Sequence, residues 1–541
     1  MASRAGTQPR TWLHDALLTL GLLLAFVFIG LQCKGVPVPV VPDERAYLLS
    51  AKLFEQGRLT QPTHGLGEHF ESLYVLAKPA LASRYPPLPS VFLALGLMLG
   101  SAITGVWIAC ALWGGALFAL CRELSGKTPA WLLTGLWFLF LAQGHYWSDS
   151  YWGGAVAAWA GTLVLLGVVK FRKNPGARAC ALWAGGVIAL SLTRPFEGAL
   201  YTLATLWPMA AVPDANRPAR LRRLAGTVAI TGLIALSANL AYNAAVTGDM
   251  LMFPYVAWEN HYLQAPRFIW QKNTPAPGTG PFVTQVLREG MRDFRSPAAE
   301  VRDAFVRCLD SWRSAAGLGL ALFVPVLAWR RRTRAWEAVP IIPLLLLPWF
   351  LHWIAIPYFP HYAAPFAALP WAFAALALGE IRGMKSAVLL TGGLVAAAAI
   401  INTAPGARYR PDISEKRKDL TTILHEKAAT FDLPLLFFVK VVQMRPTQAV
   451  FCGLYNDPDL ARSRAIFAWD LGDAKNRRLL SAFPGRLPIR VTIGEQARGD
   501  MRYEFYTPAP QSGPAPPTTP DLPPPPTPGT PRAPGDYLLI R

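Results

Sequence analysis

Residues 12–47 read WLHDALLTLGLLLAFVFIGLQCKGVPVPVVPDERAY, a long apolar run that leads to an acidic pair. The apolar part, Trp12 to Gln32, has about the 20 residues that a helix needs to cross the hydrocarbon core of a bilayer. No small-residue cleavage site follows it, because the chain continues into Lys34 and a Val-Pro repeat. We therefore predict a retained helix rather than a removed signal peptide.

The composition of the whole chain points to an α-helical polytopic membrane protein. Of 541 residues, 52% are hydrophobic and 16% are charged, which is too apolar for a soluble protein of this size. The short apolar run Pro89–Gly100 is predicted to be a re-entrant or interfacial helix. With the first helix, ten further runs predict about eleven membrane-spanning helices, and these runs lie near Ile103–Cys121, Ala130–Gln143, Ala155–Val169, Ala179–Thr193, Ala199–Val212, Leu224–Val246, Ala315–Trp329, Val339–Ile356, Ala363–Gly379 and Ser386–Thr403.

The distribution of positive charge predicts the orientation of these helices. If the amino terminus is cytoplasmic, each of the six inner segments carries at least two Lys or Arg residues, whereas the short outer loops carry Arg194 alone. This distribution follows the positive-inside rule, so the carboxy terminus is predicted to be extracytoplasmic. Much of the net charge of +19 is thus explained by topology. Because the basic residues are dispersed and not interleaved with aromatic ones, nucleic acid is not expected as a partner.

The predicted topology divides the chain into a membrane part, an outer domain and a tail. The outer domain has mixed apolar and charged periodicity, which favours a small α/β fold, and the tail is rich in proline, which favours an extended tether. The segments are 1–403 for the membrane domain, with outer loops at 33–88 and 247–314, then 404–507 for the outer α/β domain, 508–534 for the tether and 535–541 for the terminal segment.

The acidic pair Asp43-Glu44 lies about ten residues past the first helix, close to the membrane surface. A carboxylate at this place can accept the proton of an incoming hydroxyl, or share a divalent cation with its neighbour. The alternative is an ordinary helix start, in which the two acids open an amphipathic helix and an apolar side faces the protein. That apolar side would consist of Tyr47, Leu48, Ala51 and Phe54.

The first outer loop ends in Lys78 and then in Arg84-Tyr85-Pro86-Pro87. Lys and Arg at the level of the lipid head groups suit a phosphate, and the planar fork of Arg can hold two phosphate oxygens. Basic residues also snorkel to this depth without a ligand, which is the alternative explanation.

Three more outer turns carry polar residues where a membrane makes them costly. Asp149 lies in a Trp- and Tyr-rich turn, Arg194 precedes Pro195 in a second turn, and His361 and Tyr362 lie in a third, Tyr358–Tyr362. An aromatic belt or an interfacial histidine would explain each of them alone. All these turns, however, are predicted to face the same compartment.

Taken together, these residues match a known family. Asp43-Glu44 with Tyr47, Phe70-Glu71, and Tyr85-Pro86-Pro87-Leu88 before a helix that ends in Leu99-Gly100 resemble the first outer loop of GT-C membrane glycosyltransferases. The similarity is greatest to the group of protein O-mannosyltransferases and lipid A aminoarabinose transferases, and Asp149 resembles the acid in the second outer loop of that family. The carboxy-terminal segment is more similar to that of uncharacterised bacterial members.

The resemblance implies a fold, a reaction and a set of roles. It implies an inner (plasma) membrane enzyme that moves a hexosyl or pentosyl group from a polyprenyl-phosphate donor to an extracytoplasmic lipid, glycan or protein acceptor, with inversion. Asp43 would be the base, and Glu44 and Asp149 would assist through hydrogen bonds or a divalent cation, the one cofactor considered. The candidates for binding the donor and its phosphate are Lys78, Arg84, Tyr85, Arg194, His361 and Tyr362.

Two other functions compete with this interpretation. A transporter or flippase of lipid-linked substrates could use the same cationic turns, although we find no internal repeat and few charges deep in the spans. A non-catalytic envelope assembly protein would act through its outer tail and would tolerate substitution of Asp43 and Arg84.

Overall fold

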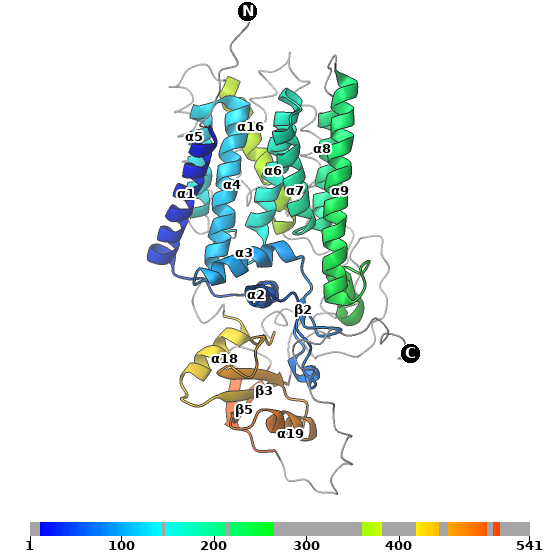
Figure 1. Ribbon diagram of the computed structural model, residues 1–541. Coiled ribbons are helices and arrows are strands. Elements are labelled where there is room, and N and C mark those ends of the chain that lie inside the picture. Colours follow the sequence, from blue (N-terminus) through cyan, green and yellow to red (C-terminus); the bar gives the residue numbers. More distant parts are fainter. Residues whose placement is uncertain are drawn as a thin grey trace, which may run out of the picture.

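The structure is a computed structural model that describes residues 11–142, 147–211, 216–263, 360–380, 418–442, 453–494 and 501–508. It consists of a bundle of upright helices and a small α/β unit below one end of the bundle (Figure 1). The upright helices are α1 (Thr11–Ile29) with its π-helical continuation η1 (Gly30–Lys34), α4 (Ala102–Ser125), α5 (Lys127–Ala142), α6 (Gly154–Lys173), α7 (Ala177–Ser191), α8 (Pro195–Ala210), α9 (Arg217–Thr247) and α16 (Ala368–Glu380).

The helical polytopic membrane fold predicted from the sequence is confirmed. Within the described residues, four helical stretches are long and apolar enough to cross a membrane, namely Asp15–Gln32, Ala102–Ser125, Gly154–Lys173 and Arg217–Thr247. The predicted spans at 315–329, 339–356 and 386–403 lie outside the described residues, so the count of eleven stays a prediction.

Two short helices lie across the end of the bundle that faces the α/β unit (Figure 1). They are α2 (Pro42–Glu55) and α3 (Pro87–Met98), and Pro at the start of each favours helix initiation because its missing N–H would have no partner there. Gly105 of α4 allows α3 to pack closely, since a Cβ at this position would collide with the carbonyl of Phe92. In the same way, Gly161 of α6 makes room for Pro365 in the 3₁₀ helix η5 (Pro360–Phe366).

The polar turns identified in the sequence meet at this end. The helices run up and down, so the turns at 147–153 and 192–194 and the helix η5 lie beside α2 and α3 (Figure 1). The opposite end carries basic loops that the sequence predicts to be cytoplasmic, where Lys170 and Lys173 both pair with Glu123.

The α/β unit is built on a four-stranded sheet with strand order β4-β3-β5-β6. The central strand β3 (Leu435–Val441) pairs in parallel with β4 (Ala465–Trp469) and β5 (Leu487–Ile493), and β5 pairs antiparallel with β6 (Met501–Phe505). Residues 435–439 are buried on both faces, as expected for a central parallel strand. The helix α18 (Leu420–Ala429) shares the core of one face, and α19 (Asp473–Ala482) that of the other.

Candidate functional site

Asp43 and Glu44 both lie in the first turn of α2, so the acidic pair does open a helix, as the alternative explanation predicted. The carboxylate of Glu44 turns back onto the chain that precedes the helix. Its Oε2 accepts hydrogen bonds from the backbone N–H groups of Val40 at 2.7 Å and Val41 at 3.2 Å, and its Oε1 accepts one from Tyr151 N–H at 3.0 Å. Glu44 therefore fixes α2 to the turn that carries Asp149.

Burial raises the pKa of Glu44 to about 7, although the three backbone hydrogen bonds lower it. The folded protein thus keeps this proton up to a higher pH than the unfolded chain, where the ordinary value is 4.5. Between these two values the folded state binds more protons, so its stability falls as the pH rises. We expect the melting temperature to fall between pH 5 and pH 8, and this fall to be smaller in Glu44→Gln. Equal pH dependence of the two melting curves would show that Glu44 does not titrate in this way.

Asp43 faces the opposite way from Glu44 and belongs to a chain of hydrogen bonds. The hydroxyl of Tyr85 donates to Oδ1 of Asp43, and Nη2 of Arg84 donates to the Tyr85 oxygen at 3.1 Å. The ring of Tyr85 stacks on that of Tyr47 with centroids 4.4 Å apart, and the Tyr85 carbonyl accepts from Tyr242 at 3.0 Å. Asp43 itself is half-buried, so its carboxylate is positioned on one side and accessible on another.

Arg84 is enclosed by aromatic rings. Its guanidinium lies 3.7 Å from the ring centroid of Tyr74, 4.3 Å from Tyr255 and 4.6 Å from Trp258. Its Nη1 is 3.8 Å from the carboxylate of Glu259, and only 6% of the residue is exposed. Cation–π contacts and an acid therefore compensate the buried charge from several sides.

The residues around Arg84 were not singled out in the sequence. Tyr74 is held beside it by a two-strand hairpin of β1 (Val75–Leu76) and β2 (Ala82–Ser83), in which Arg84 N–H donates to the Tyr74 carbonyl at 3.0 Å. The other partners come from α10 (Pro254–Trp258) and η3 (Glu259–Leu263). The spacing of Tyr255, Trp258 and Glu259 places them on one helix face, which is the signal that could have been recognised.

Arg194 is the second buried arginine at this end. Its Nη1 is 3.9 Å from the carboxylate of Glu197, and its guanidinium lies 5.0 Å from the ring centroid of Tyr362. Burial raises the pKa of Tyr47 to about 12, and the charges of Arg194, Asp43 and Arg84 also act on its hydroxyl. These charges reach Tyr47 from α2 itself, from the end of the first outer loop and from the turn before α8.

Three other residues predicted for the site, Asp149, Lys78 and His361, have surroundings unlike those of the two arginines. Asp149 is buried, accepts from the Ser148 hydroxyl at 3.1 Å, and lies two residues before the amide that binds Glu44. Lys78 is exposed, and its charge acts on Glu71. His361 lies in η5, but its side chain is outside what the structure describes.

The described residues do not build a divalent-cation site around Glu44. Both oxygens of its carboxylate already accept backbone N–H donors, which compete with a cation for the same lone pairs. In the described ranges, no three His, Cys, Asp or Glu side chains are grouped so that they could hold a metal ion. No chemical step is therefore assigned to a metal at Glu44 and Asp149.

Comparison with known proteins finds likeness in solved structures only. ArnT from Cupriavidus metallidurans bound to undecaprenyl phosphate is 13% identical over 88% of this chain and 93% of that chain, with a TM-score of 0.50. The apo form of the same ArnT is 15% identical over 89% of this chain and 93% of that chain, with a TM-score of 0.47. The oligosaccharyltransferase AglB from Archaeoglobus fulgidus, in complex with an inhibitory peptide and a dolichol-phosphate, is 12% identical over 90% of this chain and 69% of that chain, with a TM-score of 0.46. No protein-family model matches the chain, and no curated protein gives a significant match.

Proposed function

We propose that this chain, whose fold is similar to that of ArnT, is a membrane glycosyltransferase of the GT-C kind. It moves a hexosyl or pentosyl group from a polyprenyl-phosphate donor to an extracytoplasmic lipid, glycan or protein acceptor, with inversion. The observation that carries the proposal is the Asp43 carboxylate, held by the hydroxyl of Tyr85, which in turn accepts from the buried Arg84.

In this mechanism, Asp43 is the base. The acceptor hydroxyl or amine attacks the anomeric carbon and gives its proton to the Asp43 carboxylate. The bond between that carbon and the phosphate oxygen breaks, and its electron pair stays on the lipid phosphate. A nearby cation stabilises the charge that develops there.

We assign the cationic residues two different roles. Arg84 is a positioning residue, because four rings and Glu259 surround its guanidinium and one of its N–H groups donates to Tyr85. Arg194, next to Tyr362 and Tyr47, is the proposed phosphate ligand, with exposed Lys78 as a second one that reaches the head-group region. Glu44 and Asp149 position α2, and His361 stays a candidate from the sequence.

The proposed placement puts the site on the outer side of the inner (plasma) membrane. The amino terminus and the basic loops are then cytoplasmic, and the α/β unit is extracytoplasmic. The support is the separation of the two ends of the bundle, since the basic inner loops lie opposite the end that carries Asp43 (Figure 1).

The direct test is sugar transfer by the purified protein. Radiolabelled polyprenyl-phosphate hexoses and pentoses are incubated with the protein and a membrane extract, and the label is followed into new products. Transfer from one donor supports the proposal and identifies that donor. Binding of lipid-linked sugar without any transfer would contradict it and favour a transporter.

Replacing Tyr85 by Phe is expected to lower kcat about 10- to 100-fold, because the carboxylate of Asp43 loses a charge-assisted hydrogen bond. Burial raises the pKa of Tyr85, so in the unmodified protein this hydroxyl remains a donor. Tyr242→Phe is the matched control, since it removes a buried hydroxyl whose one hydrogen bond among the described residues goes to the Tyr85 carbonyl. Equal losses of kcat in the two variants would contradict a specific role of the Tyr85 hydroxyl.

A further inference from the structure

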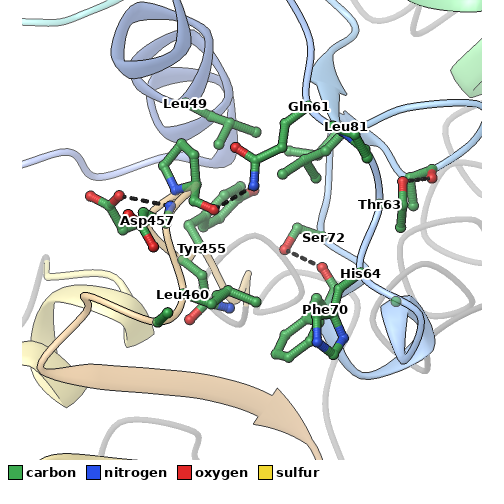
Figure 2. A pocket seen from close by; sticks show the side chains of 18 of the residues that line it. Leu49, Gln61, Thr63, His64, Phe70, Ser72, Leu81, Tyr455, Asp457 and Leu460 are labelled. Atoms are coloured by element: carbon green, nitrogen blue, oxygen red, sulfur yellow. Dashed lines mark hydrogen bonds between the residues drawn. The ribbon is translucent and has the colours of Figure 1, made fainter. Parts of the chain in front are cut away.

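A cavity of about 460 Å³ lies between the first outer loop and the α/β unit. Figure 2 shows it between α2, which contributes Leu49, the loop residues Gln61 and His64, and the segment with Tyr455. None of Asp43, Arg84 and Arg194 lines it, so it is separate from the site described above. Its volume lies within the roughly 300–1,000 Å³ that is typical of small-molecule sites.

Contacts across the cavity hold its two walls together. Gln61 Nε2 donates to the carbonyl of Pro458 at 2.7 Å, and the Tyr455 hydroxyl donates to the carbonyl of Leu73 at 2.9 Å. Each bond joins the first outer loop to the α/β unit, so the cavity belongs to the docked arrangement of the two.

One side of the cavity is aromatic. The imidazole of His64 stacks on Phe483 with centroids 5.4 Å apart, and Phe70 meets the imidazole edge-on at 5.6 Å. Figure 2 shows His64 and Phe70 side by side at this wall. Aromatic surfaces of this kind pack against the C–H faces of a sugar ring, whereas a simple anion such as phosphate gains nothing from them.

The charged side chains that line the cavity are Arg58, Asp457 and Asp459, and both acids are paired with cations outside the lining. Asp457 pairs with Lys52 at 2.6 Å, and Asp459 pairs with Arg462 at 3.3 Å. Arg58 is exposed, and its guanidinium has no ion-pair or hydrogen-bond partner in the part of the chain that the structure describes. The cavity therefore offers an uncompensated positive charge to an anionic group.

His64 adds a second donor. Its Nδ1 accepts the backbone N–H of Leu66 at 3.1 Å, so in the neutral ring the proton is on Nε2. Burial lowers the pKa of His64, which favours this neutral form.

The back wall of the cavity connects it to the Asp43 cluster. Tyr455 lines the cavity, and its hydroxyl donates to the carbonyl of Leu73, the residue that precedes Tyr74 of the Arg84 surroundings. Leu49, on the α2 helix that begins with Asp43, lines the cavity from the other side. A molecule bound here is thus next to the elements that hold the proposed base.

We infer that this cavity binds an anionic saccharide, a sugar ring that carries a carboxylate or a phosphate, through Arg58 and the aromatic wall. It serves as the recognition subsite for the acceptor, and this second statement rests on the proposed glycosyltransferase function. The proposed donor site at Arg194 is a different place.

The test measures binding without requiring transfer. Glucuronic acid, glucose 6-phosphate, glucose, inorganic phosphate and a tri-aspartate peptide are titrated into the full-length protein, and binding is followed by ligand-observed NMR. We expect the two anionic sugars to bind more tightly than glucose and than phosphate. Arg58→Gln should weaken their binding about 10-fold or more. Lys440→Gln removes the same charge from an exposed position of the α/β unit outside the cavity, and should leave binding unchanged.

Other binding results would overturn all or part of the inference. Failure of both anionic sugars to bind, or equal binding by Arg58→Gln, overturns the inference. Phosphate that binds as tightly as glucose 6-phosphate overturns the saccharide assignment, and so does a preference for the acidic peptide.

Transfer assays on the same variants separate this inference from the proposed function. If transfer occurs, Arg58→Gln should raise KM for the acceptor and leave kcat nearly unchanged. Transfer without sugar binding would overturn the cavity inference alone. Sugar binding that depends on Arg58, without transfer from any donor, would overturn the proposed function and the acceptor role, and would support the saccharide site.

Discussion

Asp43→Asn is expected to reduce kcat for sugar transfer by about 100- to 10,000-fold, the usual contribution of a general base. Asn has almost the same shape as Asp, and its carbonyl oxygen can still accept the hydrogen bond from Tyr85. The variant should therefore fold normally and still bind the lipid-linked donor, but it cannot take the proton of the acceptor. The measurements are single-turnover transfer, donor binding and the melting temperature.

Asp249→Asn is the matched control for this prediction. Asp249 is an exposed acid in the turn after α9, at the same end of the bundle, and its carboxylate accepts the local backbone N–H of Leu251 at 2.9 Å. It should transfer sugar at the unmodified rate. Normal transfer by Asp43→Asn would rule out Asp43 as the base.

The second large effect is expected where the α/β unit holds α2. Nε and Nη2 of Arg45 donate to the two carboxylate oxygens of Asp419, each at 2.8 Å, and Asp419 is almost fully buried. The same carboxylate caps α18 by accepting the N–H of Thr422 at 2.9 Å. Asp419→Ala therefore leaves Arg45 without its partner and removes the cap.

We expect Asp419→Ala to lower the free energy of local opening of α18 by about 3 kcal/mol, the lower end of the range for breaking a buried pair. Amide hydrogen exchange in α18 would then be about 100-fold faster. Lys52→Gln is the control, because the pair of Lys52 with Asp457 is about 40% exposed on both sides and should contribute at most about 1 kcal/mol. Equal exchange rates in the two variants would show that the pair of Arg45 with Asp419 does not stabilise α18. Because Arg45 is two residues from Asp43, Asp419→Ala should also slow sugar transfer.

The two acids of the starting motif illustrate how far local sequence can predict a site. Asp43 and Glu44 are adjacent, and both were predicted to take part in the chemistry. Successive residues in a helix point in directions about 100° apart. As a result, Glu44 turns to the backbone of Val40, Val41 and Tyr151, whereas Asp43 meets Tyr85. The rotation of α2 against its neighbours decides which of the two acids binds backbone N–H groups and which one meets Tyr85.

Arg84 illustrates a contact that the local sequence does not contain. A basic residue at the membrane surface was predicted to bind phosphate, on the basis of charge and depth alone. The rings of Tyr255 and Trp258 come from beyond α9, about 170 residues later in the chain, and they occupy the space around its guanidinium. A partner so distant in sequence is set by the packing of the bundle.

The amino-acid sequence by itself determined the membrane class, the positions of the described apolar helices and the end of the bundle at which the polar turns meet. These features follow from local physics, because a bilayer requires about 20 apolar residues per helix and each crossing reverses the side. The contacts of Arg84, Arg194 and Glu44, and the cavity beside Tyr455, were decided only by the tertiary structure. Each of them depends on side chains from segments far apart in the chain, and the packing that brings these together has no local pattern in the sequence.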